Sequence, residues 1–241
     1  MHKISIFGSC RQDSIYKYFW TSSIRNKLTY PHYSSEAVQA IKYCLGYIKS
    51  QDLPTKFVFR SWIISKKKYS QKKLIKALKK TDICIIEIAT RRSYKYKNIF
   101  LHHISEDKEY KFKDKEKINI HVMTNYEIEE DIIKIKELLP NKKIIIATHF
   151  YTKKSGPRYE LVLALKDISK RHQLPIFDPV EELGGIDEIK ALLVEEPVLS
   201  HYTKDGHNEV GKRYVNFINK NFSVKPSKLL VLKNKIKSLF K

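Results

Sequence analysis

Apolar and polar residues follow one another along the chain in a pattern that predicts alternating strands and helices. Three short runs of β-branched and other apolar residues are typical of buried parallel strands, at 4–7, 82–88 and 142–147. Two shorter stretches predict further strands, at 56–59 and 174–179. Apolar residues at helical spacing predict helices over residues 12–20, 36–48, 70–80, 124–139, 158–172, 186–194 and 208–221. This order predicts an α/β fold, a three-layer α/β/α sandwich with a mainly parallel sheet.

Residues 1–222 are expected to form one domain, because no repeat or linker-like segment divides them. Within this domain, residues 94–119 are polar, aromatic and charged without a clear period. That composition predicts an insertion or lid-like excursion, with a hairpin around residues 108–112. Residues 223–241 form a basic amphipathic tail that is expected to dock on the core, the alternative being peripheral contact with an anionic membrane surface.

The charge balance indicates an anionic partner. The chain has 47 basic and 26 acidic residues, a formal net charge of +21, which would attract polyanions, anionic lipid surfaces or phosphate-bearing substrates. However, only 8 of the basic residues are arginines. Arginine is the residue expected where bases or phosphates are gripped through two hydrogen bonds, so nucleic acid is not the favoured partner.

The chain is expected to be a soluble cytoplasmic protein. It has no run of about 18 apolar residues that could span a membrane, and its amino terminus lacks the apolar segment of a signal peptide. The three cysteines, Cys10, Cys44 and Cys84, share no metal-ligand spacing, and their odd number argues against a disulfide framework. We therefore expect no metal site and no required cofactor.

Reactive residues follow three of the predicted strands. Gly8-Ser9-Cys10-Arg11 comes directly after the first strand, Arg91 and Arg92 after the strand at 82–88, and His149 after the strand at 142–147. Anionic groups and reactive side chains usually collect at the carboxyl ends of parallel strands, where helix amino termini also point. With His201 near the end of the chain, this order matches one way of building covalent acyl transfer: an early nucleophile, a late histidine, and backbone amides at a helix start.

Two of these segments resemble motifs of the SGNH/GDSL hydrolase superfamily. Residues 6–10 look like its first block, where an apolar strand leads into Gly-Asp-Ser with the serine as nucleophile. Residues 201–207 resemble its last block, in which the catalytic histidine stands where this chain has His201. The resemblance covers most of residues 1–222. It implies a flavodoxin-like α/β fold and an esterase, thioesterase or acyltransferase activity.

The chain departs from this family at the nucleophile and at the acid. An ungapped alignment puts Cys10 in place of the serine and Ser9 in place of the aspartate, whereas a slip of one residue would make Ser9 the nucleophile. We favour Cys10, whose thiolate a helix amino terminus, Arg11 and an imidazole would activate. The acid expected three residues before His201 is replaced by Val198. A backbone carbonyl or another carboxylate would then orient the imidazole, the candidates being Asp178, Glu195 and Glu196.

The asparagine that helps this family bind the oxyanion is also missing. In its place stand Arg91 and Arg92, which are candidates for binding a charged oxygen together with the backbone around Gly8 and Arg11. Surface ion pairs are the equally weighted alternative for the two arginines. His149 is a candidate for substrate contact, against the simpler interpretation of a hydrogen-bonded histidine at a strand end.

The Gly-Ser-Cys variant also resembles, more loosely, SGNH-like proteins associated with polysaccharide biosynthesis, some of which bind acyl-CoA. That resemblance implies acyl-CoA as a donor substrate and acyl transfer to or from a glycan. The alternative function is a catalytically degenerate scaffold that binds a polyanion, either nucleic acid or an anionic glycan, through its lysine-rich surface.

Overall fold

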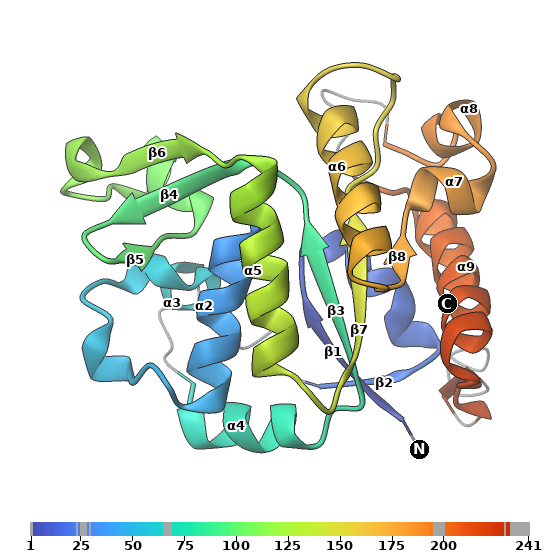
Figure 1. The fold of residues 1–241 in the computed structure, drawn as a ribbon, viewed down its shortest axis with the longest axis horizontal. Coiled ribbons are helices and arrows are strands. Elements are labelled where there is room, and N and C mark those ends of the chain that lie inside the picture. Colours follow the sequence, from blue (N-terminus) through green and yellow to red (C-terminus); the bar gives the residue numbers. More distant parts are fainter. Residues whose placement is uncertain are drawn as a thin grey trace.

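A five-stranded parallel sheet with the order β2-β1-β3-β7-β8 runs through the centre of the computed structural model, which describes residues 2–22, 24, 28, 30–64, 69–194, 201–228, 230 and 231 (Figure 1). Every neighbouring pair in this sheet is parallel. Its strands are β1 (Lys3–Phe7), β2 (Trp20–Thr21), β3 (Ile83–Ile88), β7 (Lys143–Thr148) and β8 (Ile176–Phe177).

The apolar runs form strands because both of their faces are buried. All six residues of β3 are buried, and they alternate between two hydrophobic clusters. Cys84, Ile86 and Ile88 face one cluster, whereas Ile83 and Ile85 face the other. A strand covered on both faces is apolar at nearly all of its positions, as in parallel sheets generally.

Helices cover each face of the sheet, which confirms the predicted three-layer α/β/α sandwich. One cluster takes its helical residues mainly from α2 (Ser34–Leu45), α4 (Gln71–Lys79) and α5 (Asn125–Leu138). The other takes them mainly from the 3-10 helix η1 (Cys10–Lys17), from α7 (Pro179–Leu183) and from α9 (Lys204–Phe222). Helix α6 (Pro157–Arg171) contributes to both clusters, and α8 (Ile186–Lys190) precedes α9 (Figure 1).

A glycine sets how closely α9 approaches η1. A Cβ on Gly211 would lie 2.5 Å from the backbone oxygen of Ser14 and 2.6 Å from the Tyr18 ring. This packing positions the helix that begins at Cys10. We expect Gly211→Ala to destabilise the protein by up to about 2 kcal/mol, because overpacking costs about 1–3 kcal/mol and the gain in helix propensity offsets about 1 kcal/mol of that cost.

Thermal unfolding of Gly211→Ala measures this cost. For a chain of this length the midpoint should fall by about 2–4 °C for each kcal/mol. Asn216→Ala is the matched control, since this side chain is exposed on the same helix and its replacement should be neutral or slightly stabilising. If the unfolding midpoints of Gly211→Ala and Asn216→Ala are equal, α9 and η1 can move apart without a cost in stability.

Residues 92–122 contain a second, smaller sheet with the order β5-β4-β6, drawn at the upper left of Figure 1. Its antiparallel strands are β4 (Arg92–Tyr96), β5 (Ile99–Phe100) and β6 (Asn119–Val122). The hairpin predicted at residues 108–112 is wrong, because Lys108–Tyr110 form the 3-10 helix η5. The hairpin turn lies instead between β4 and β5, where Lys97 has a φ of 54°.

Two other predicted elements differ from the structure. Residues 56–59 are not a strand: they form the 3-10 helix η3 (Lys56–Val58) and its cap Phe59, and α3 (Arg60–Ile64) follows. The helix predicted over 12–20 starts earlier, at Cys10, as a 3-10 helix, and is followed by the edge strand β2. The remaining short 3-10 helices are η2 (Ser50–Asp52), η4 (His103–Glu106) and η6 (Lys115–Lys117).

The described start of the expected tail lies on the core. Val224 is buried, and the Ser227 amide donates to the Tyr18 carbonyl oxygen at 2.9 Å. Residues 229 and 232–241, which carry most of the predicted amphipathic pattern, lie outside the described part of the chain. Within the described part, no helix combines the length and the apolar character needed to cross a bilayer.

Candidate active site

The predicted reactive loops meet at the carboxyl edge of the central sheet. Strands β1, β3 and β7 are adjacent and parallel, with Phe7 paired to Ile86 and Ile88 paired to Thr148. The turn that starts at Gly8 therefore lies beside the end of β3 and the loop that starts at His149. The second sheet and the loop before α6 lie at this same end (Figure 1).

A buried carboxylate fixes the turn after β1. The Ser9 amide donates to Glu87 Oε2 at 2.5 Å, and Glu87 on β3 is fully buried. A Cβ on Gly8 would lie 2.7 Å from Glu87 Cβ, so only glycine fits beside this side chain. Sequence reasoning missed Glu87. Its signal was present as a lone carboxylate inside the apolar run of β3, because a buried charge requires a hydrogen-bonding partner.

The two candidate nucleophiles occupy different environments. Ser9 is only 2% exposed and caps η1. Its Oγ accepts hydrogen bonds from the Arg11 amide at 3.4 Å and from Arg11 Nη1 at 3.2 Å. Cys10, the first residue of η1, is partly exposed. Ser9 therefore shapes the turn, while the Cys10 side chain is the more accessible of the two.

Cys44 and Cys84 are buried free thiols, unlike Cys10. Burial raises the pKa of both, that of Cys84 to about 12. A thiol reagent is therefore expected to react first at Cys10.

Arg11 connects loops from the beginning, middle and end of the sequence. Its guanidinium bonds to Ser9 and lies 5.6 Å from the centre of the Phe150 ring. After burial, the charge of Arg11 is the next cause that lowers the pKa of both His149 and His201. Arg11 thus lies within electrostatic reach of both histidines.

The surroundings of His149 set the tautomer and the protonation state of its ring. The ring is buried, and its Nδ1 lies 2.8 Å from the carbonyl oxygen of Phe150. Because a carbonyl oxygen only accepts, Nδ1 carries the proton and the neutral ring keeps a lone pair on Nε2. Burial, then the charges of Arg11 and Arg158, hold the pKa of His149 well below 6.5. At neutral pH this histidine can accept a proton or a hydrogen bond.

His201 lies just before α9, next to a short β-bridge between Leu193 and Tyr202. Its side chain is largely exposed, whereas Tyr202 is buried. His207, on α9, approaches Ser14 Oγ with Nδ1 at 2.9 Å and so belongs to the contact between α9 and η1. Of these two histidines, His201 faces the solvent side of the site.

The electrostatic link between Arg11 and His201 leads to a titration experiment. Burial, followed by the charge of Arg11, lowers the pKa of His201 from 6.5, so its ring should remain neutral to a lower pH than a free imidazole. Arg11→Gln removes a positive charge that disfavours the imidazolium, and the pKa of His201 should rise towards 6.5. Proton NMR titration, with His201→Gln to assign the resonance, measures both values. An unchanged midpoint in Arg11→Gln would place His201 beyond the reach of Arg11.

Of the acids that could orient the His201 ring, the structure describes Asp178. Asp178 is buried at the start of α7, where Oδ1 accepts from the Val180 amide at 3.0 Å and Oδ2 lies 2.7 Å from Lys166 Nζ. Its carboxylate thus has partners on α7 and on α6. Glu195, Glu196 and Val198 lie outside the described residues.

A cleft of about 620 Å³ adjoins the site and is lined by four cationic side chains, Arg91, Arg92, Lys153 and Arg158. Arg91 also donates to the Met123 carbonyl oxygen and to Asn125 Oδ1. Arg158 lies 5.9 Å from the centre of the Phe150 ring, the ring that Arg11 also faces. The cleft therefore borders the Phe150 ring that Arg11 also faces, and it offers positive charge to a ligand.

One protein-family model matches part of this chain. The model of the TviD N-terminal domain family matches residues 2–118, slightly less than half of the chain. A comparison with curated proteins finds no match.

Two of the similar solved structures bear the names of hydrolases. A lipase/acylhydrolase from Enterococcus faecalis is 15% identical and covers 95% of this chain and 100% of its own, with a TM-score of 0.47. The acetylxylan esterase Axe2 from Geobacillus stearothermophilus is 16% identical and covers 90% of this chain and 94% of its own, with a TM-score of 0.41.

These are activities that the SGNH resemblance implies. At TM-scores below 0.5, however, the likenesses carry no conclusion about activity, which has to be argued from this chain's own side chains.

Proposed function

We propose that this protein is an SGNH-like hydrolase or acyltransferase that acts on an ester or thioester through Cys10. The observation that supports the proposal is the charge of Arg11, the residue after Cys10, which in addition to burial lowers the pKa of both His149 and His201 and so links three separate parts of the sequence. Covalent acyl transfer requires an accessible nucleophile and a neutral imidazole, and a fixed cation helps to stabilise the oxyanion.

In the proposed reaction, His201 accepts the thiol proton and Cys10 Sγ attacks the acyl carbon. The oxyanion is stabilised by the backbone amides of Cys10 and Arg11 at the start of η1, with Arg91 as a further cation. The imidazolium then protonates the leaving group, and an acyl-cysteine remains. Water or a glycan hydroxyl, deprotonated by the same imidazole, attacks this intermediate and regenerates the thiol. Ser9 acts as a positioning residue through its hydrogen bonds to Arg11.

The substrate we propose carries negative charge next to its acyl group. Arg91, Arg92 and Arg158 line the cleft that borders the site, and guanidinium groups pair well with phosphates and carboxylates. The phosphates of an acyl-CoA donor, or an anionic glycan acceptor, would satisfy them. An acyl-CoA donor would also place the reaction in the cytoplasm.

Intact-mass spectrometry tests the covalent step. Brief incubation with p-nitrophenyl acetate or acetyl-CoA, followed by acid quench, should give wild-type protein carrying one acetyl group, mapped to Cys10 in a peptide digest. Ser9→Ala should still be acetylated, and Cys10→Ala should not. Acetylation of Cys10→Ala at Ser9 would transfer the nucleophile to Ser9.

A scaffold that binds polyanions without catalysis is the alternative, favoured by the same cationic cleft. It predicts no adduct and no turnover, together with retention on heparin that falls steeply with salt. Retention that is lost in Arg92→Ala, without any acyl adduct in wild-type protein, would support this alternative over catalysis.

A further inference from the structure

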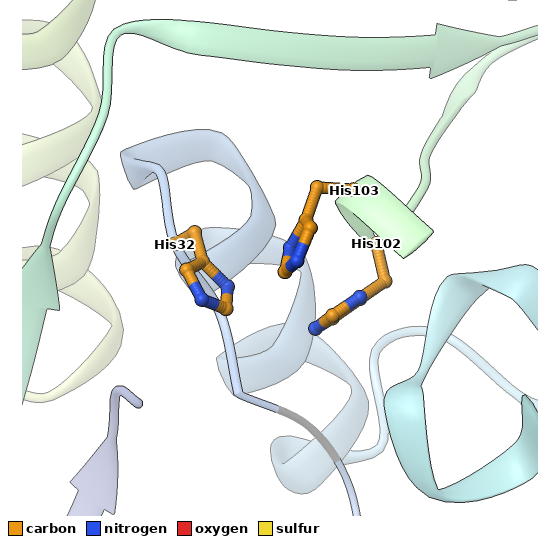
Figure 2. Close-up of side chains that lie close together, drawn as sticks. All are labelled: His32, His102 and His103. Atoms are coloured by element: carbon orange, nitrogen blue, oxygen red, sulfur yellow. The ribbon is translucent and has the colours of Figure 1, made fainter. Parts of the chain in front are cut away.

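Three histidines gather beside the candidate active site, and the acyl-transfer reaction does not use them. His32 precedes α2, and His102 and His103 stand at the start of η4; their rings point towards one another (Figure 2). The His32 and His103 ring centres are 4.2 Å apart, and those of His102 and His103 are 4.3 Å apart. One nitrogen from each ring lies within 4.8 Å of the other two.

Each of these rings has a buried nitrogen without a hydrogen-bond partner in the described structure: His32 Nδ1, His102 Nε2 and His103 Nδ1. His102 is fully buried. A buried polar atom normally finds a partner, because leaving it without one costs about 1–3 kcal/mol. Because one nitrogen of each ring lies within 4.8 Å of the other two, a single ligand between the rings would bind all three.

The chemistry of the cluster suits a cation. A neutral imidazole keeps a lone pair on one of its two ring nitrogens. Neutral imidazole is the ligand that zinc and neighbouring transition metals accept most often.

We propose that His32, His102 and His103 form a three-histidine site for a divalent transition-metal ion such as zinc. Zinc bonds to imidazole nitrogens at about 2.0–2.1 Å, which places three such nitrogens about 3.3 Å apart in a tetrahedral site. Small side-chain rotations close the observed separation of up to 4.8 Å. The Ile104 amide contact to His102 Nδ1, at 3.3 Å, opens if His102 binds through Nε2, since Nδ1 then holds the proton.

The surroundings of the cluster favour an anionic fourth ligand. Arg11 and Arg60 both act on these histidines electrostatically. Two guanidinium groups beside a divalent ion repel it, and a hydroxide or a substrate carboxylate on its fourth position offsets that repulsion. Three protein ligands with one exchangeable position is the pattern of catalytic rather than structural zinc sites. This site is independent of the proposed Cys10 chemistry.

Metal titration of the full-length, tag-free protein tests the proposal. After chelator treatment and dialysis, wild-type protein should bind one Co²⁺ with the visible spectrum of a tetrahedral site, and one equivalent of Zn²⁺ should displace it. His32→Gln and His103→Gln should each weaken Zn²⁺ binding by at least about 100-fold, because loss of even an outer partner of a ligand costs 10–100-fold.

His121→Gln is the matched control, since this partly exposed histidine pairs with Glu127 away from the cluster. It should bind Co²⁺ like wild type. Circular dichroism on each variant shows whether it folds, and Zn²⁺ should raise the unfolding temperature of wild type and of His121→Gln but not of His103→Gln. Wild-type protein without a tetrahedral Co²⁺ spectrum, or folded cluster variants that bind as tightly as the control, would overturn the proposal.

Discussion

Cys10→Ala is expected to lower the rate of acyl transfer by at least about 10³-fold, the largest effect of any single substitution in this protein. Removing the nucleophile of a covalent mechanism leaves only the contribution of substrate binding and oxyanion stabilisation. Steady-state turnover of p-nitrophenyl acetate and of acetyl-CoA measures the loss. The fold should be retained, because Cys10 is only partly buried and belongs to neither of the two hydrophobic clusters.

Two variants separate the role of Cys10 from that of its neighbour. Cys10→Ser keeps a nucleophilic atom in place and should retain part of the activity if His201 can deprotonate the hydroxyl. Ser9→Ala should cost much less than Cys10→Ala, because it removes only the hydrogen bonds to Arg11 at 3.2 and 3.4 Å. If Ser9→Ala is the inactive variant and Cys10→Ala retains turnover, the nucleophile is Ser9.

Glu87→Ala is expected to lower turnover by about 10²-fold without touching the reacting atoms. The Glu87 carboxylate holds the Ser9 amide at 2.5 Å and so fixes where η1 begins. Its loss leaves that amide without an acceptor and opens space beside Gly8, and a displacement of about 1 Å at a reacting group costs on this order. The loss should fall mainly on kcat.

Glu87→Gln distinguishes positioning from charge. The amide oxygen of glutamine can still accept the hydrogen bond from Ser9, so turnover should return to within about tenfold of wild type. Its unfolding free energy should equal or exceed that of wild type, because Glu87 Oε1 is buried without a partner in the described structure and burying an unsatisfied charge is costly. Equal losses in Glu87→Gln and Glu87→Ala would show that the negative charge itself takes part in the reaction.

The sequence by itself determined the layers of the fold and the position of its reactive loops. The runs that became β1, β3 and β7 are continuous in apolar residues because both of their faces are buried, a local property that the pattern records directly. The start of α5 can likewise be recognised in the sequence, because Thr124 and Glu127 have the spacing of a capping box, three residues apart. That the loops after β1 and β7 start at the same edge of the sheet followed from the rule that parallel strands share one carboxyl edge.

Tertiary structure decided the features that depend on partners distant in sequence. Residues 56–59 have the composition of a strand, yet Lys56–Val58 form η3, in which Phe57 and Val58 are buried without pairing in either described sheet. The role of Glu87 depends on its hydrogen bond with the Ser9 amide, 78 residues away in the sequence. The role of His32 depends on its position beside a pair of histidines that begins 70 residues further along the chain. Periodicity reports which face of an element is buried, whereas a polar contact across the core depends on how the elements dock. The turn at Gly8 was therefore predictable from the sequence. The Glu87 carboxylate that holds this turn and the cluster of three histidines were not.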